Sequence, residues 1–184
     1  MYLKTSFFTT LKIYFKLVAL ILGSNLIFEL LLVLFDPTTV SYFFIWNPFV
    51  SSFIHSNWSH LGYNLIALLL FLIPSINHSL GLKGLLFYAT LIAFISLPFV
   101  VMQLTQPIVG ISGLFYFLMT RFVFGLSKYK TPVRIVFVLL IIGELILLGN
   151  NDNISHFCHL IGVGLATIVH LKSPKQIQQA NIVS

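Results

Sequence analysis

The 184-residue chain has very little charge. Asp, Glu, Lys and Arg make up only 8% of it, whereas hydrophobic residues make up 58%. A water-soluble domain of this size needs a polar surface, which this composition cannot supply. The single cysteine, Cys158, excludes an internal disulfide framework and a metal site built from cysteines alone. We therefore expect an integral membrane protein, and no motif in the chain calls for a cofactor.

Apolar segments long enough to form helices recur along the chain, and they do not alternate as the strands of a membrane barrel would. We place six membrane-spanning helices at 13–35, 58–74, 83–102, 111–127, 133–149 and 155–171. The second, fourth and sixth segments are short for a span of roughly 20 residues, which favours helices that begin below the membrane surface. The predicted fold is an all-α membrane protein with one domain, a six-helix bundle over 13–171.

The segments outside this bundle are assigned by charge and aromatic content. All ten Lys and Arg residues fall on one side of the predicted bundle, and Asp36 and Asp152 fall in loops on the other side. The positive-inside rule then makes both flanking segments, 1–12 and 172–184, cytoplasmic. Positions at helix ends explain the basic residues better than a nucleic-acid partner does. The aromatic-rich stretch 36–57 is expected to lie as a loop in the outer interface, and the pattern suits a bacterial plasma membrane.

Ser112 lies within Gly110-Ile111-Ser112-Gly113 at the outer start of the fourth segment. Gly110 can adopt backbone angles closed to other residues, and Gly113 lets a neighbouring helix come close. A hydroxyl in such a place is a candidate nucleophile. A helix N-cap serine is the alternative interpretation.

His159 lies about one turn inside the sixth segment, and Gly162 and Ala166 continue the same helix face. Small residues allow two helices to approach closely. If this face meets Gly113, His159 reaches Ser112 and can accept its proton as a general base. A histidine hydrogen-bonded between helices is the alternative, and His156 is a competing candidate for the base.

His60 and Asn64 are four residues apart and share one face of the second segment. Both can donate hydrogen bonds, as an oxyanion requires, and the backbone N–H of Ser112 is a further donor. A metal site made of His55, His60 and His159 is an alternative, but no carboxylate accompanies them in a recognisable ligand spacing. We therefore expect no metal.

The four acidic residues receive no catalytic role. Neither Asp36 nor Asp152 is placed to complete a triad, so the predicted working pair is a dyad. Glu29 and Glu144 lie within the first and fifth segments and are interpreted as structural. A proton-relay role for these two is the alternative.

Together these motifs resemble the rhomboid family of intramembrane serine proteases, over residues 46–166. His55-Ser-Asn-Trp-Ser-His60-Leu-Gly-Tyr-Asn64 is similar to the family's His-x4-His-x3-Asn motif on its second helix. Gly110-Ile-Ser112-Gly113 is similar to its Gly-x-Ser-Gly nucleophile motif, and His159-Leu-Ile-Gly162 to its sixth-helix histidine motif. Each motif alone is weakly specific, but three in the right order on the right helices are strong.

The resemblance implies a six-helix core with an active site open to the outer face. Ser112 would be the nucleophile and His159 the base, while His60, Asn64 and the Ser112 N–H would bind the oxyanion. Tyr116 would pack against the catalytic histidine, and the fifth span would move to admit substrate. His55 would be structural, at the junction of loop and helix. One departure is Trp46-Asn47, where the family commonly has Trp-Arg.

The predicted function is an endopeptidase that cleaves transmembrane or juxtamembrane segments of other membrane proteins. Within the same class, the small core also resembles rhombosortases, which are thought to process C-terminal sorting tails. A catalytically inactive rhomboid-like protein that binds membrane helices is the rival from another class, although such relatives usually lack the serine or the histidine. A small transporter would need polar residues across the whole membrane, whereas here they cluster near one face.

Overall fold

A computed structural model describes residues 7–45, 47–55, 57–76, 81–103, 110–125, 130–147 and 153–172. Within them the chain is helical and has no strand. The helices are α1 (Phe7–Leu34), α2 (Pro37–Ile45), α3 (Pro48–Ser51), α4 (Trp58–Ile76), α5 (Leu82–Gln103), α6 (Ser112–Gly125), α7 (Lys130–Leu147) and α8 (Asn153–Lys172). The prediction of an all-α protein is confirmed for this part of the chain. Residues 1–6 and 173–184, including most of the two predicted cytoplasmic segments, lie outside the described residues, as do Trp46 and Asp152.

The six long helices α1, α4, α5, α6, α7 and α8 coincide with the six apolar segments. The largest difference is at α1, which begins at Phe7 rather than at residue 13. Thr10, in this extra stretch, is buried, so packing against the bundle extends the helix beyond its most apolar part.

The predicted interfacial loop 36–57 is not a simple loop, because it contains the short helices α2 and α3. The Asp36 carboxylate accepts hydrogen bonds from the Thr39 N–H (2.8 Å) and the Thr39 hydroxyl (2.9 Å) at the start of α2. The Asn47 side chain accepts the N–H of Val50 (3.2 Å) at the start of α3. A proline follows each of these residues, the usual arrangement at a helix N-terminus. Asn47, which departs from the family's arginine, therefore has a capping role.

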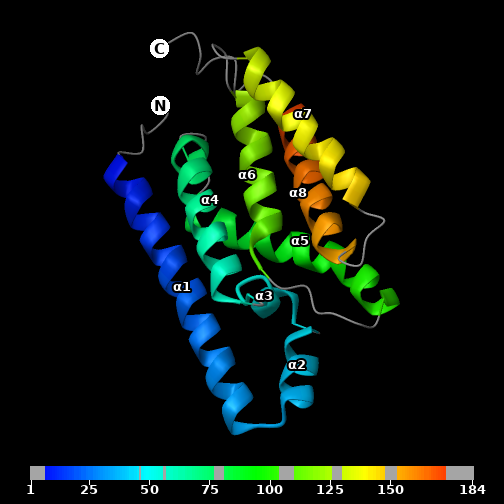
Figure 1. Ribbon diagram of the computed structural model, residues 1–184. Coiled ribbons are helices and arrows are strands. Elements are labelled where there is room, and N and C mark those ends of the chain that lie inside the picture. Colours follow the sequence, from blue (N-terminus) through cyan, green and yellow to red (C-terminus); the bar gives the residue numbers. More distant parts are fainter. Residues whose placement is uncertain are drawn as a thin grey trace.

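α1 and α7 run in one direction and α4, α6 and α8 in the opposite one, while α5 crosses them at a steep angle; α1 begins at the same end of the bundle at which α8 finishes (Figure 1). α6 occupies the centre and contacts α4, α5, α7 and α8. Residues 112–114 and 116–120 of this helix are all buried. A helix that is covered on nearly every side belongs to the core of a bundle. Ser112 therefore lies on a helix that neighbouring helices surround.

The outer surface of the described bundle is rich in exposed apolar side chains. The stretch Phe8–Leu34 has 27 residues and contains an 18-residue window with a mean hydropathy of 2.5, of which only 17% is buried. Among the described residues it is the helix that is long and apolar enough by itself to cross a membrane. On α7, Val136, Leu139 and Ile146 are all more than half exposed. Apolar surface on this scale marks contact with lipid or with other proteins.

Candidate active site

The turn that precedes α6 places Ser112 at the first position of that helix, where it is buried. Gly110 has a φ angle of +111°, which only glycine adopts readily. The Gly110 N–H donates to the Ser51 carbonyl of α3 (3.2 Å), so the turn is tied to α3. A methyl group on Gly110 would lie 3.4 Å from His55 Nε2 and 3.5 Å from His60 Cε1. The structure therefore brings both histidine rings against the turn that leads to Ser112.

α6 and α8 meet backbone to backbone through two glycines. A Cβ atom on Gly162 would collide with the carbonyl oxygen of Gly113. A Cβ atom on Gly113 would lie 3.1 Å from the Cys158 carbonyl oxygen and 2.7 Å from Ile92. The predicted meeting of the small-residue faces is thus present, and Ala166 on the same face is fully buried. No side chain separates the helix that begins at Ser112 from the helix that carries His159.

The His159 ring is held on two sides. It stacks on the Tyr116 ring, with centroids 4.2 Å apart and planes 14° apart, as expected for Tyr116 from the sequence. Its Nδ1 lies 2.9 Å from Oε2 of Glu144. Its Nε2 is buried and has no hydrogen-bond partner among the described residues, so no hydrogen bond joins it to Ser112 there. The nitrogen that would have to accept a proton is thus the unoccupied one.

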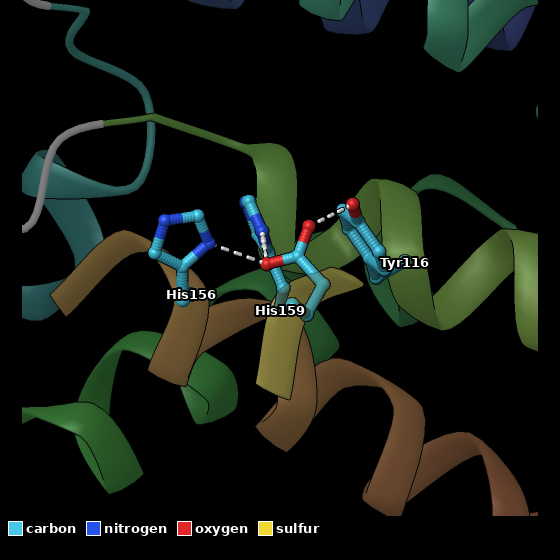
Figure 2. Close-up of polar contacts among 4 residues, drawn as sticks. Tyr116, His156 and His159 are labelled. Carbon is cyan, nitrogen blue, oxygen red and sulfur yellow. Dashed lines mark hydrogen bonds and ion pairs between the residues drawn. The ribbon is translucent and has the colours of Figure 1, made fainter. Parts of the chain in front are cut away.

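Glu144, which was interpreted from the sequence as structural, contacts the predicted catalytic histidine. It is buried on α7, and its two carboxylate oxygens bind three side chains. Oε1 accepts the Tyr116 hydroxyl, while Oε2 lies 2.6 Å from His156 Nδ1 and 2.9 Å from His159 Nδ1. Figure 2 shows the two imidazole rings and the tyrosine converging on this carboxylate. The other glutamate of the chain, Glu29, is exposed on α1.

A signal for Glu144 was present in the sequence. It lies near the end of the fifth apolar segment, and His156 and His159 lie near the start of the sixth. Consecutive helices joined by a short connection are usually antiparallel neighbours, so these three residues share one depth. The predicted dyad is therefore incomplete: in the sequence neither Asp36 nor Asp152 is placed as a triad acid, but the Glu144 carboxylate contacts His159.

α4 contributes a second polar group to the site. Asn64 is buried, and its Nδ2 has no hydrogen-bond partner among the described residues. His60 lies one turn earlier, and its backbone N–H is capped by the Asn57 side chain (2.8 Å). The His55 and His60 rings make an edge contact with centroids 5.3 Å apart. Because α4 packs on α6, Asn64 offers a buried N–H donor on the helix beside Ser112.

The segment that carries His55 is fixed by Asn25 of α1, a residue that sequence reasoning missed. The Asn25 amide donates to the Phe53 carbonyl (2.7 Å), and its oxygen accepts the His55 N–H (2.8 Å). Burial lowers the pKa of the His55 imidazole to about 4, and the neighbouring His60 adds to this effect. His55 is therefore neutral near pH 7 and belongs to the packed wall of the site.

The predicted alternative metal set of His55, His60 and His159 does not form one cluster in the described part of the chain. The group with ligand atoms close together is Glu144, His156 and His159, all within 4.8 Å of one another. These donors are of a type that binds zinc. Their separations of 2.6 and 2.9 Å, however, are those of hydrogen bonds to a shared carboxylate.

Comparison with protein families gives one result. The family model described as the Rhomboid domain matches residues 42–173, more than two thirds of the chain. The matched region runs from α2 to the end of α8 and includes Ser112, His159, His60, Asn64 and Glu144. Searches of the curated proteins and of the solved structures found no match.

Proposed function

Because the chain belongs to the rhomboid family, whose members are integral membrane proteins and generally serine proteases, we propose that it is an intramembrane serine endopeptidase. Ser112 is the nucleophile and His159 the general base. The observation that carries this proposal is the state of His159 Nε2, which is buried and has no hydrogen-bond partner among the described residues, while stacking and a carboxylate hold its ring. The glycine contact between α6 and α8 supports the pairing, because it joins the two helices directly.

The reaction follows from these positions. Ser112 Oγ attacks the carbonyl carbon of the scissile peptide bond as its proton passes to His159 Nε2. The tetrahedral oxyanion accepts hydrogen bonds from Asn64 Nδ2, from His60 and from the Ser112 N–H. His159 then gives its proton to the leaving amine, which departs and leaves an acyl-enzyme. A water molecule, activated by the same nitrogen, hydrolyses that ester and restores Ser112.

We propose that the six long helices all cross the membrane and that both ends of the bundle's chain face the cytoplasm. Lys12 and Lys16 near the start of α1, and Arg134 near the start of α7, support this orientation. Ser112 begins α6 at the end of the bundle opposite to the start of α1 (Figure 1). The active site then opens to the outer side, and a single-span membrane protein in a bacterial plasma membrane is the proposed substrate.

Cleavage of a single-span substrate in proteoliposomes tests the proposal. Ser112→Ala should abolish cleavage and labelling by a serine-directed phosphonate, and His159→Ala should lower both by at least about 10³-fold. His156→Ala should lower the cleavage rate much less, because His156 contacts Glu144 and takes no direct part in the proposed reaction. Full cleavage by the Ser112 variant would contradict the nucleophile, and retained activity of the His159 variant would transfer the base to His156.

The same preparation separates the two other candidates. A rhombosortase would prefer substrates that end in a Gly-Gly-type sorting tail, so matched substrates with and without such a tail measure that preference. An inactive helix-binding protein would bind the substrate but leave it intact, and its Ser112 would not react with the phosphonate. Both candidate catalytic residues are present, which favours the enzyme.

A further inference from the structure

We propose that Glu144 is a positioning residue for His159, so that α7 must be seated against α8 before the base can act. The proposal rests on the proposed function, because it assigns a role within the same site. It goes beyond a serine–histidine dyad by adding a carboxylate from a third helix. It rests on the tautomer of His159, on the contacts that hold the Glu144 carboxylate, and on the exposed apolar surface of α7.

The first step is the tautomer. A carboxylate oxygen 2.9 Å from His159 Nδ1 is an acceptor, so the proton of the neutral ring belongs on Nδ1. Nε2 then carries the lone pair, and it is the atom without a partner among the described residues. Without the carboxylate, the ring would be free to place its proton on Nε2, where it cannot accept another from Ser112.

The second step is the support of the carboxylate itself. Tyr116 donates its hydroxyl to Glu144 Oε1 and also stacks on the His159 ring. His156 contacts the same Oε2 as His159, at 2.6 Å. The Glu144 carboxylate is therefore anchored from α6 and from α8 and cannot rotate freely. Such anchoring distinguishes a positioning group from a carboxylate that merely fills a gap.

The third step concerns α7. Most of its described apolar side chains are exposed, and a pocket of about 320 Å³ on this helix is lined by Val136, Leu139, Leu140, Gly143 and Glu144. Within the described part of α7, Glu144 is the residue that makes hydrogen bonds to other helices. If α7 moved outward to admit a substrate, the carboxylate would leave His159. Chemistry would then have to wait until α7 returned.

Glu144→Gln tests the assignment, with Glu29→Gln as the matched control, because Glu29 is also a membrane-segment carboxylate but lies exposed on α1. The amide keeps the shape but loses the charge, and its NH₂ group can donate to Nδ1 and so favour the unproductive tautomer. We expect kcat and the rate of phosphonate labelling to fall together by on the order of 10- to 10³-fold, with KM unchanged. The loss of about 10⁴-fold known for a triad aspartate is the upper bound. Glu29→Gln should change neither rate.

Each outcome decides between the possibilities. Wild-type kcat and labelling in the Glu144 variant would overturn the proposal, and so would an effect confined to KM, which would indicate substrate binding instead. If Ser112→Ala protein still cleaves, the proposed function itself has failed, and with it this role. A readout that needs no Glu144 variant is ¹⁵N NMR of histidine-labelled protein. A His159 resonance protonated at Nδ1, assigned by its loss in His159→Ala, supports the proposal, and protonation at Nε2 in the neutral ring refutes it.

Discussion

Ser112 is supported from two sides by quite different means. On the α8 side, Gly113 and Gly162 let two backbones touch, and no polar side chain takes part in that contact. On the side of α1 and α3, hydrogen bonds hold the turn: Asn25 fixes Phe53 and His55, and the Ser51 carbonyl accepts the Gly110 N–H. The first support therefore depends on the absence of volume, and the second depends on the presence of polar groups.

This difference teaches how a site can be rigid inside an apolar bundle. Close helix contact needs no polar group and so incurs no desolvation cost, but it tolerates no added atom. A buried hydrogen bond can reach across a loop, but each member becomes a liability when its partner is lost. The two supports should thus respond to different perturbations, and three experiments separate them.

The largest effect is expected from adding one methyl group to the glycine contact. Gly162→Ala places a Cβ against the Gly113 backbone, which cannot rotate away as a side chain would. We expect a loss of roughly 3 kcal/mol or more in stability, together with loss of cleavage, because α8 must move away from Ser112. Thermal unfolding in detergent and the proteoliposome assay measure the two effects.

Gly164→Ala is the matched control for that experiment. Gly164 lies two residues further along α8, and a Cβ there would have no atom within 4 Å. Alanine is the better helix former, so this variant should be neutral or more stable by up to about 1 kcal/mol. Equal behaviour of the two variants would show that the contact does not depend on volume.

A smaller effect is expected from deleting the polar anchor on α1. Asn25→Ala leaves the Phe53 carbonyl and the His55 N–H without their partner, and unpaired buried groups cost about 1–3 kcal/mol each. Activity should fall because the His55 segment packs against the Gly110 turn. Ser24→Ala is the control, since none of these hydrogen bonds involves Ser24. An unchanged unfolding temperature for the Asn25 variant would contradict the role of this anchor.

The smallest effect is a dependence of stability on pH, which arises from His55 in the hydrogen-bonded support beside α1 and α3. The pKa of His55 is lowered to about 4 in the folded protein, and it rises to near 6.5 on unfolding. The unfolded chain therefore binds more protons between these values, so stability is full above pH 6.5 and declines as the pH falls toward 4. Between pH 7 and pH 5 the loss is at most about 2 kcal/mol.

His55→Asn should flatten this dependence, because an amide does not titrate in the range. Unfolding temperatures of both proteins at pH 7 and pH 5 provide the measurement, and the difference between the two pH dependences cancels the contribution of groups that do not interact with His55. The same slope in the variant would mean that His55 is not the source.

The positions of the long helices could be predicted because they follow from runs of apolar residues, which are read one residue at a time. The short helices α2 and α3 escaped prediction, although Asp36 and Asn47 each precede a proline in a helix-start pattern. The aromatic content of the stretch 36–57 led to the prediction of an interfacial loop, which did not take those helix-start patterns into account. The capping residues of both short helices could therefore have been identified from the sequence.

The site divides in the same way. His159, Gly162 and Ala166 could be related by spacing, because periodicity tells which residues share a helix face. Glu144 and Asn25 could not be placed so easily, since Glu144 binds side chains of α6 and α8, and Asn25 binds the backbone of Phe53 and His55. Those contacts depend on how the helices and the segment around Phe53 and His55 pack against one another. Such contacts arise from packing, which periodicity within one helix does not encode.

The buried thiol of Cys158 has a practical consequence. It is 4% exposed, and its S–H donates to the Ser96 hydroxyl (3.2 Å) between α8 and α5. As the sole cysteine of the chain, it leaves the protein surface free of reactive thiols without any engineering. A cysteine introduced at Val138, a half-exposed position on α7, would carry a spin label or fluorophore alone. A label attached there would report on the motion of α7 without any prior removal of native cysteines.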